Sequence, residues 1–224
     1  MSTDSDADRE ELPTVGRLLA LSDGVVAIAL TLLVLQLAVP LVANANSASA
    51  LASALTRDRG DRLIAYTISF YVIAQFWLVH HRVFYMITGQ REGLAWWNFA
   101  FLFTITVMPF TSDLLGRYSE NPLAVDIFAV NLLLASLATQ ATLIFARRSG
   151  LLRPGPAYGP QSFRAGEYRQ LGTLLVILLS IGLAWVNTGL AKYCWLLLAL
   201  VPNLAARLTR PPKSSASGGP GASS

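Results

Sequence analysis

Long uncharged stretches dominate the pattern of hydrophobic and polar positions along the chain. They cover residues 24–56, 63–81, 93–112, 127–146 and 170–191. An α-helix needs about 20 apolar residues to cross the hydrocarbon core of a bilayer, and each stretch is close to or above that length. A shorter apolar run follows Lys192, whose long side chain can reach the membrane surface, so we count a sixth span there. The pattern predicts an all-α integral membrane protein with six transmembrane helices.

The helices define one membrane domain with polar segments on either side. We place the spans near 14–39, 62–86, 94–115, 123–146, 167–186 and 190–208, so that the domain covers 14–208. Residues 1–13 are acidic and residues 209–224 are rich in Pro, Gly and Ser, so both segments are expected to be disordered. The Pro-rich stretch from Arg147 to Gly166 is expected to be an extended connector. Pro109 lies inside the third span, where it can kink the helix.

Composition and charge support a membrane protein and oppose a soluble enzyme. Hydrophobic residues make up 54% of the chain, charged residues only 13%, and the mean hydropathy is +0.50. The net charge of +4 is confined to loops and ends, which is typical of membrane topology and not of nucleic-acid binding. With a cytoplasmic N-terminus, 12 of the 17 Lys and Arg residues lie on the inner side and 5 on the outer side. This split predicts a multi-pass protein of the cell membrane with both termini in the cytoplasm.

Polar side chains interrupt the start of the first helix. Arg17, Ser22 and Asp23 precede or enter an otherwise apolar segment. A carboxylate inside a membrane is costly unless it is paired or hydrated, so Asp23 is expected to have a functional or architectural role. The alternative is that Asp23 lies near the lipid headgroups and is simply solvated.

One face of the same helix is apolar apart from a single hydroxyl. Ile28, Thr31, Leu32 and Leu35 follow the spacing i, i+3, i+4 and i+7, which places them in one stripe. Such a stripe can line a pathway for a solute. Helix packing is the simpler explanation, because apolar stripes are common in membrane bundles.

The end of the second helix contains both histidines of the chain. Trp77 and His80 can share a helix face and hydrogen-bond to a polar residue of another helix, such as Asn98 in the third span. His80 and His81 point in different directions and no Cys or carboxylate cluster accompanies them, so no tightly bound metal or other cofactor is expected. An enzymatic activity is not expected either, because the chain lacks the Gly-x-Ser-x-Gly sequence that surrounds the nucleophilic serine of many hydrolases. Thr14-Val15-Gly16 matches the start of the Thr-Val-Gly-Tyr-Gly selectivity filter of potassium channels, but Arg17 follows in place of Tyr-Gly. We therefore regard this match as a coincidence.

These segments together resemble one known family of membrane proteins. Residues 17–35 read RLLALSDGVVAIALTLLVL and match the signature RxxxFSDGVxAIAxTLLVL of the transmembrane protein 175 family of potassium channels. Further matches are FWLVHHRVF at 76–84, Trp97-Asn98, MPFT at 108–111 and NLLL at 131–134. The chain departs from the signature at Leu21, where Phe is usual. The resemblance covers Arg17 to Arg148 and is to the short prokaryotic form, which suggests a prokaryotic plasma membrane.

The resemblance implies a potassium-permeable channel that is a homotetramer, with the pore formed by the first helix. Bulky aliphatic side chains at Ile28, Leu32 and Leu35 would form the constriction, with a hydroxyl ring at Thr31 and transient potassium near Ile28 and Thr31. The matched positions that would brace the pore helix are Arg17, Ser22, Asp23, Trp77, His80 and Asn98. The implied partners are other copies of the chain, the lipid bilayer and potassium ions, with no nucleic acid.

An apolar ring can block ions by dewetting, and a hydroxyl ring can replace some water of hydration. Because it offers few oxygen ligands, such a pore is expected to prefer potassium over sodium only modestly. Two alternatives stay open. One is a proton-coupled secondary transporter that uses Asp23 and His80, although no inverted repeat or broken helix is visible. The other is an assembly subunit without transport activity.

Overall fold

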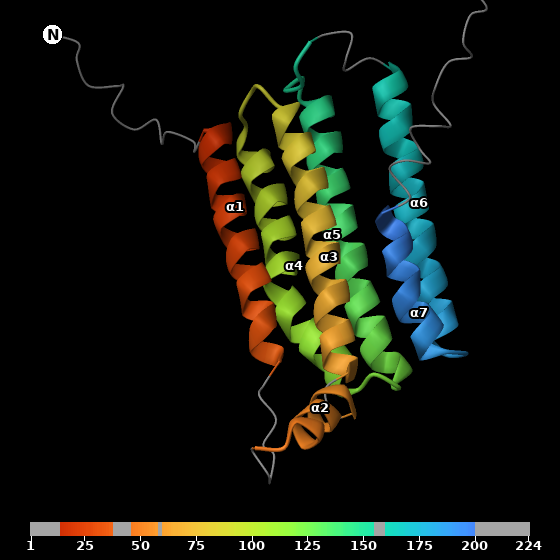
Figure 1. Cartoon of the computed structure of the whole chain (residues 1–224). Coiled ribbons are helices and arrows are strands. Elements are labelled where there is room, and N and C mark those ends of the chain that lie inside the picture. Colours follow the sequence, from red (N-terminus) through yellow and green to blue (C-terminus); the bar gives the residue numbers. More distant parts are fainter. Residues whose placement is uncertain (1–13, 38–45, 58–59, 155–159, 200–224) are drawn as a thin grey trace, which may run out of the picture.

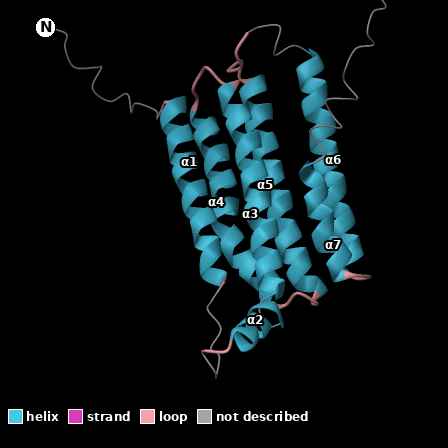
Figure 2. Cartoon of the chain, in the orientation of Figure 1, coloured by secondary structure: helices cyan, strands magenta, loops and turns pink. Residues whose placement is uncertain are grey.

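The computed structural model describes residues 14–37, 46–57, 60–154 and 160–199. In this part of the chain, all regular secondary-structure elements are helices (Figure 2). The helices are α1 (Val15–Leu32), α2 (Ala48–Arg57), α3 (Gly60–Tyr85), α4 (Glu92–Arg117), α5 (Pro122–Arg148), α6 (Pro160–Ala184) and α7 (Thr188–Cys194). Short 3-10 segments, Leu33–Gln36 and Trp195–Ala199, extend α1 and α7.

Among the described residues, five helices are long and apolar enough to cross a membrane, and they confirm the first five predicted spans within a few residues. These are Val15–Gln36, Gly60–Tyr85, Glu92–Arg117, Pro122–Arg148 and Gly166–Ala184. They run alternately up and down in one bundle, with α1 at one edge and α6 and α7 at the other (Figure 1). The chain is therefore an integral membrane protein. The sixth predicted span, 190–208, begins as α7 and its 3-10 extension, but residues 200–208 lie outside the described part.

Two segments differ from the sequence-based expectation. The expected extended connector between Arg147 and Gly166 is shorter, because α5 continues to Arg148 and α6 begins at Pro160. A proline is well placed there, since the first turn of a helix needs no amide hydrogen from it. The hydrophobic pattern did not predict α2, which is rich in Ala and Ser and lies beyond the end of the bundle opposite the N-terminus (Figure 1). The predicted disordered ends, 1–13 and 209–224, lie outside the described residues.

Helices α3 and α4 lie inside the bundle and form its main core. Val26, Ala29 and Leu33 of α1 pack into this core together with Ile73, Phe101 and other buried side chains. Helix α4 remains continuous through Pro109. Gly93 allows α4 and α5 to approach closely, because a Cβ atom at this position would lie 2.4 Å from the Phe145 ring. The rigid core thus holds α1 by one face and leaves its other face uncovered.

Candidate functional site: the uncovered face of the first helix

The stripe predicted on the first helix lies on the uncovered side of α1. Ile28, Leu32 and Leu35 are 60%, 43% and 72% exposed, and Thr31 is exposed as well. The Thr31 hydroxyl donates a hydrogen bond of 2.8 Å to the carbonyl oxygen of Ile28, so its lone pairs remain free to face outward. The stripe therefore does not serve packing within the chain. It is available to a second copy, to lipid or to an aqueous pathway.

The opposite face of α1 explains why the stripe is turned outward. Its buried positions follow the period of the helix and are Leu18, Ser22, Val26, Ala29, Leu33 and Gln36. A helix of 3.6 residues per turn buries one such face and leaves the other exposed. Two positions on this buried face, Ser22 and Gln36, are polar, and each lies near one end of the helix. Each makes hydrogen bonds to another helix, so the polar contacts anchor α1 near both ends.

The anchor near the N-terminal end, which we call the inner anchor, consists of Ser22, Asp23, Trp77, His80 and Asn98. Trp77 Nε1 donates to Asp23 Oδ1 at 2.8 Å, joining α3 to α1. Ser22 Oγ and His80 Nε2 lie 3.0 and 2.8 Å from Asn98 Oδ1, which joins α1 and α3 to α4. The structure thus brings together five of the six residues that sequence analysis assigned to bracing.

The buried imidazole of His80 is held on several sides. Its ring stacks between Phe84 and Phe101, with centroid distances of 4.5 and 4.3 Å. Asn98 Oδ1 can accept from Nε2–H, which fits the neutral tautomer protonated at Nε2. His80 Nδ1 has no hydrogen-bond partner among the described residues. A second proton on this ring would therefore lack an acceptor there, so the site favours a neutral, structural histidine.

Arg17, the sixth predicted member, does not join the inner anchor within one chain. Its side chain is exposed, and the structure records no hydrogen bond or ion pair for it among the described residues. Only its backbone N–H is engaged, as a donor of 3.3 Å to the capping hydroxyl of Thr14. Arg17 lies eleven residues before Ile28, about three turns, and so faces the same uncovered side. Its bracing role stays a prediction.

Sequence analysis missed a second anchor at the other end of α1. This outer anchor consists of Gln36, Ser69, Ser112 and the carbonyl group of Pro109. Gln36 Nε2 donates to the Pro109 carbonyl at 3.0 Å, and Ser112 Oγ donates to Gln36 Oε1 at 2.9 Å. Ser69 Oγ then donates to Ser112 Oγ at 2.7 Å. The available signal was Gln36 itself, because it continues the spacing of the buried face of α1.

The fold and this site define a class: a polytopic helical membrane protein whose first helix is anchored near both ends and presents an uncharged, mainly aliphatic stripe over residues 28–35. The model of the family described as endosomal/lysosomal potassium channel TMEM175 matches residues 17–109. That match includes α1 from Arg17 onwards and all six residues predicted to brace the helix. The chain belongs to the TMEM175 family.

Individual relatives support this assignment. A potassium channel of Streptomyces collinus is 32% identical over 189 residues, covering 83% of this chain and 89% of that protein. A potassium channel of a Chryseobacterium species is also 32% identical, over 127 residues that cover 56% of this chain and 61% of that protein. The crystal structure of a lysosomal potassium-selective channel TMEM175 homolog from Chamaesiphon minutus aligns with a TM-score of 0.69 at 25% identity, covering 85% of this chain and 97% of that one.

Proposed function

We propose that this chain is a potassium-permeable channel, with the stripe of α1 as the constriction of its pore. The observation that carries the proposal is the face formed by Ile28, Thr31, Leu32 and Leu35, which contains no charge and remains exposed in the described part of the chain. Relatives named as potassium channels support the choice of ion. The family is one of ion channels and not of enzymes.

A single bundle with α1 at its edge cannot enclose a pathway, so several copies are needed. We propose a homotetramer with the α1 helices innermost and the stripe facing the four-fold axis. Because α1 is held through its opposite face by two polar anchors, its outward face can line an axis without losing contacts inside its own chain. We also propose that α7 continues into a sixth transmembrane helix. Both termini would then lie in the cytoplasm. The excess of arginine at the N-terminal end of the bundle supports that orientation.

The proposed mechanism is an apolar gate. Four copies of Ile28, Leu32 and Leu35 would narrow the pore and expel water, which blocks ions until the ring widens slightly. Four Thr31 hydroxyl groups would offer oxygen ligands at the same level, because each donates its hydrogen to its own backbone and keeps its lone pairs. This is far fewer ligands than a carbonyl filter supplies, so a modest preference for potassium over sodium is expected.

The transporter alternative needs a shared proton site at Asp23 and His80. Each residue has its own partner instead, Trp77 for Asp23 and Asn98 for His80, and no hydrogen bond joins the two in the described structure. This arrangement favours the channel. It also supports an anchoring role for Asp23 and His80 over a role in ion binding.

Reconstitution of the purified chain into liposomes tests the proposal. A channel predicts unitary current steps and a reversal potential that follows the potassium gradient more closely than the sodium gradient. Saturable uptake that requires a proton gradient, without unitary steps, would support the transporter instead. Native mass measurements in mild detergent and in lipid nanodiscs should give four chains, and a monomer or dimer in both would contradict the proposed assembly.

A further inference from the structure

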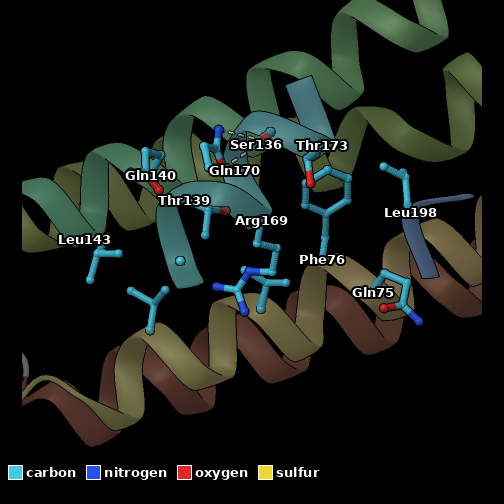
Figure 3. Close-up of a pocket in the computed structure, with 13 residues that line it drawn as sticks. Gln75, Phe76, Ser136, Thr139, Gln140, Leu143, Arg169, Gln170, Thr173 and Leu198 are labelled. Carbon is cyan, nitrogen blue, oxygen red and sulfur yellow. Dashed lines mark hydrogen bonds between the residues drawn. The ribbon is translucent and has the colours of Figure 1, made fainter. Parts of the chain in front are cut away.

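A cavity lies between α3, α5 and α6, away from the stripe on α1 (Figure 3). Its volume is about 50 Å³, and it opens to the exterior. One part of its wall is polar and comes mainly from α5 and α6, with Ser136, Thr139, Gln140, Arg169, Gln170 and Thr173. The other part is apolar and includes Phe76, Val79 and Val83 of α3 and Leu143 of α5. The cavity is therefore amphipathic.

Arg169 is the charged side chain in this wall. It belongs to the first turn of the apolar stretch Gly166–Ala184, and its guanidinium group extends across the cavity towards α3 (Figure 3). It is half-buried, and no carboxylate or hydrogen-bond acceptor contacts it among the described residues. The adjoining segments 155–165 and 200–224 contain no Asp or Glu that could pair with it. The charged group that acts on it is Arg82 of α3, which has the same sign.

A cation without an acidic partner among the described residues is stabilised by binding an anion. A guanidinium group within a membrane span is costly unless it is paired, and a second arginine nearby increases the cost. Planar guanidinium groups bind phosphate oxygens well, and the adjacent side chains of Gln140 and Thr173 can add hydrogen bonds to a headgroup. Basic cavities between transmembrane helices at the cytoplasmic side recur as sites for anionic lipid headgroups.

The apolar wall distinguishes a lipid from a free phosphate ion. Leu143 lies on the side of Arg169 that faces the end of the bundle where α6 begins. Phe76 and Leu198 lie on the other side of Arg169, on the path that an acyl chain would take deeper into the membrane (Figure 3). We propose that the cavity binds an anionic phospholipid, with the headgroup phosphate on Arg169 and an acyl chain against Phe76 and Leu198. The site is separate from the proposed constriction, and its occupancy can be measured without any ion current.

Native mass spectrometry of the full chain with added phosphatidylglycerol or phosphatidylcholine tests this site. Wild-type protein should retain phosphatidylglycerol in preference to phosphatidylcholine as detergent strips other lipids. Arg169→Gln should reduce that retention about fivefold or more, because it removes the positive charge nearest the phosphate. Arg169→Lys should keep part of it. The matched control is Arg148→Gln, which removes an exposed arginine at the same end of the bundle outside the cavity.

Three results would overturn the proposal. They are equal retention of the two lipids by the wild type, unchanged phosphatidylglycerol retention in Arg169→Gln, and displacement of the lipid from the wild type by millimolar inorganic phosphate alone. A second measurement needs no variant and remains decisive if Arg169→Gln does not fold. Phosphatidylglycerol with a photoreactive acyl chain should cross-link to wild-type peptides that contain Phe76 or Leu198. Cross-links confined to other helices would place the lipid elsewhere and contradict the assignment.

Discussion

Trp77 Nε1 donates a hydrogen bond of 2.8 Å to Asp23 Oδ1, and this bond fixes α1 to α3 at a point five residues before Ile28. At 1.5 Å per residue, the carboxylate lies about 7–8 Å along the helix axis from the level of Ile28. Asp23 is half-buried and turned towards α3, while the Ile28 side chain is exposed. The carboxylate is thus placed to hold the helix that presents the stripe, and not to touch an ion at the stripe.

Replacement of Trp77 tests this anchoring role. Trp77→Phe keeps an aromatic ring but removes the donor, which leaves the Asp23 carboxylate without its partner and is expected to cost about 1–3 kcal/mol. Thermal unfolding of the purified assembly in detergent measures the loss. Trp96→Phe is the matched control, because Trp96 is 74% exposed and makes no hydrogen bond in the described structure. Normal stability of Trp77→Phe combined with altered ion selectivity would instead make Asp23 a pore ligand.

The outer anchor predicts a different response to single and double substitutions. Gln36→Leu leaves the Ser112 hydroxyl and the Pro109 carbonyl without this partner, and we expect a loss of about 1 kcal/mol or more in the free energy of unfolding. Adding Ser112→Ala removes the hydroxyl group that Gln36→Leu leaves without a partner. The double variant should therefore lose less free energy of unfolding than the sum of the losses in the two single variants. Urea or thermal unfolding of all four proteins gives the coupling energy. Strictly additive losses would show that Gln36 and Ser112 do not act together.

A substitution of Arg17 tests whether this residue makes contacts within its own chain or with another chain. Because its side chain is exposed and shares a face with Ile28, a bracing role requires a partner on another copy. Arg17→Gln is therefore expected to lower the fraction of tetramer without changing the helix content of the chain. Native mass measurement and circular dichroism check the two quantities. A fully assembled Arg17→Gln protein would exclude the bracing role, and a loss of helix content would place its effect within the chain.

Sequence analysis predicted the membrane class and five of the spans because long charge-free stretches have few other stable structures. It also named five residues that do form the inner anchor, because they match polar positions of the family and because polar groups in an apolar helix need partners. Asn98 was named as a possible partner of Trp77 and His80, and its Oδ1 lies 2.8 Å from His80 Nε2. The same reasoning placed Arg17 in the anchor, although its side chain has no partner within one chain.

Other features depended on contacts that no local pattern contains. The role of Gln36 follows from its position opposite the carbonyl of Pro109, which lies 73 residues away in the chain. Helix α2 has an Ala- and Ser-rich sequence whose hydrophobicity is too weak for the criteria that locate membrane spans. The cavity at Arg169 arises where α3, α5 and α6 fail to close on one another, a result of packing that spacing within one helix does not reveal.

Substitutions in the stripe test the proposed gate. Ile28→Asn should raise potassium flux, because a polar ring removes the dewetting barrier, and Ile28→Ala should widen the constriction and weaken discrimination against sodium. Single-channel recordings in bilayers measure conductance and reversal potential for each variant. Val34→Ala is the matched control, since Val34 is exposed on the same helix but points away from the stripe. Equal conductance and selectivity across these proteins would contradict the proposed gate and would indicate that the stripe only packs between subunits.

Thr31 provides the sharpest test of how the proposed pore would prefer potassium. Thr31→Val keeps the size of the side chain and removes the hydroxyl, whereas Thr31→Ser keeps the hydroxyl and removes a methyl group. If the four hydroxyl groups replace water around a passing ion, Thr31→Val should conduct but lose most of its preference for potassium over sodium, and Thr31→Ser should retain it. Reversal potentials under opposed potassium and sodium gradients separate the two. The reverse pattern, with selectivity lost in Thr31→Ser and kept in Thr31→Val, would show that the width of the aliphatic ring sets selectivity and that the hydroxyl groups do not.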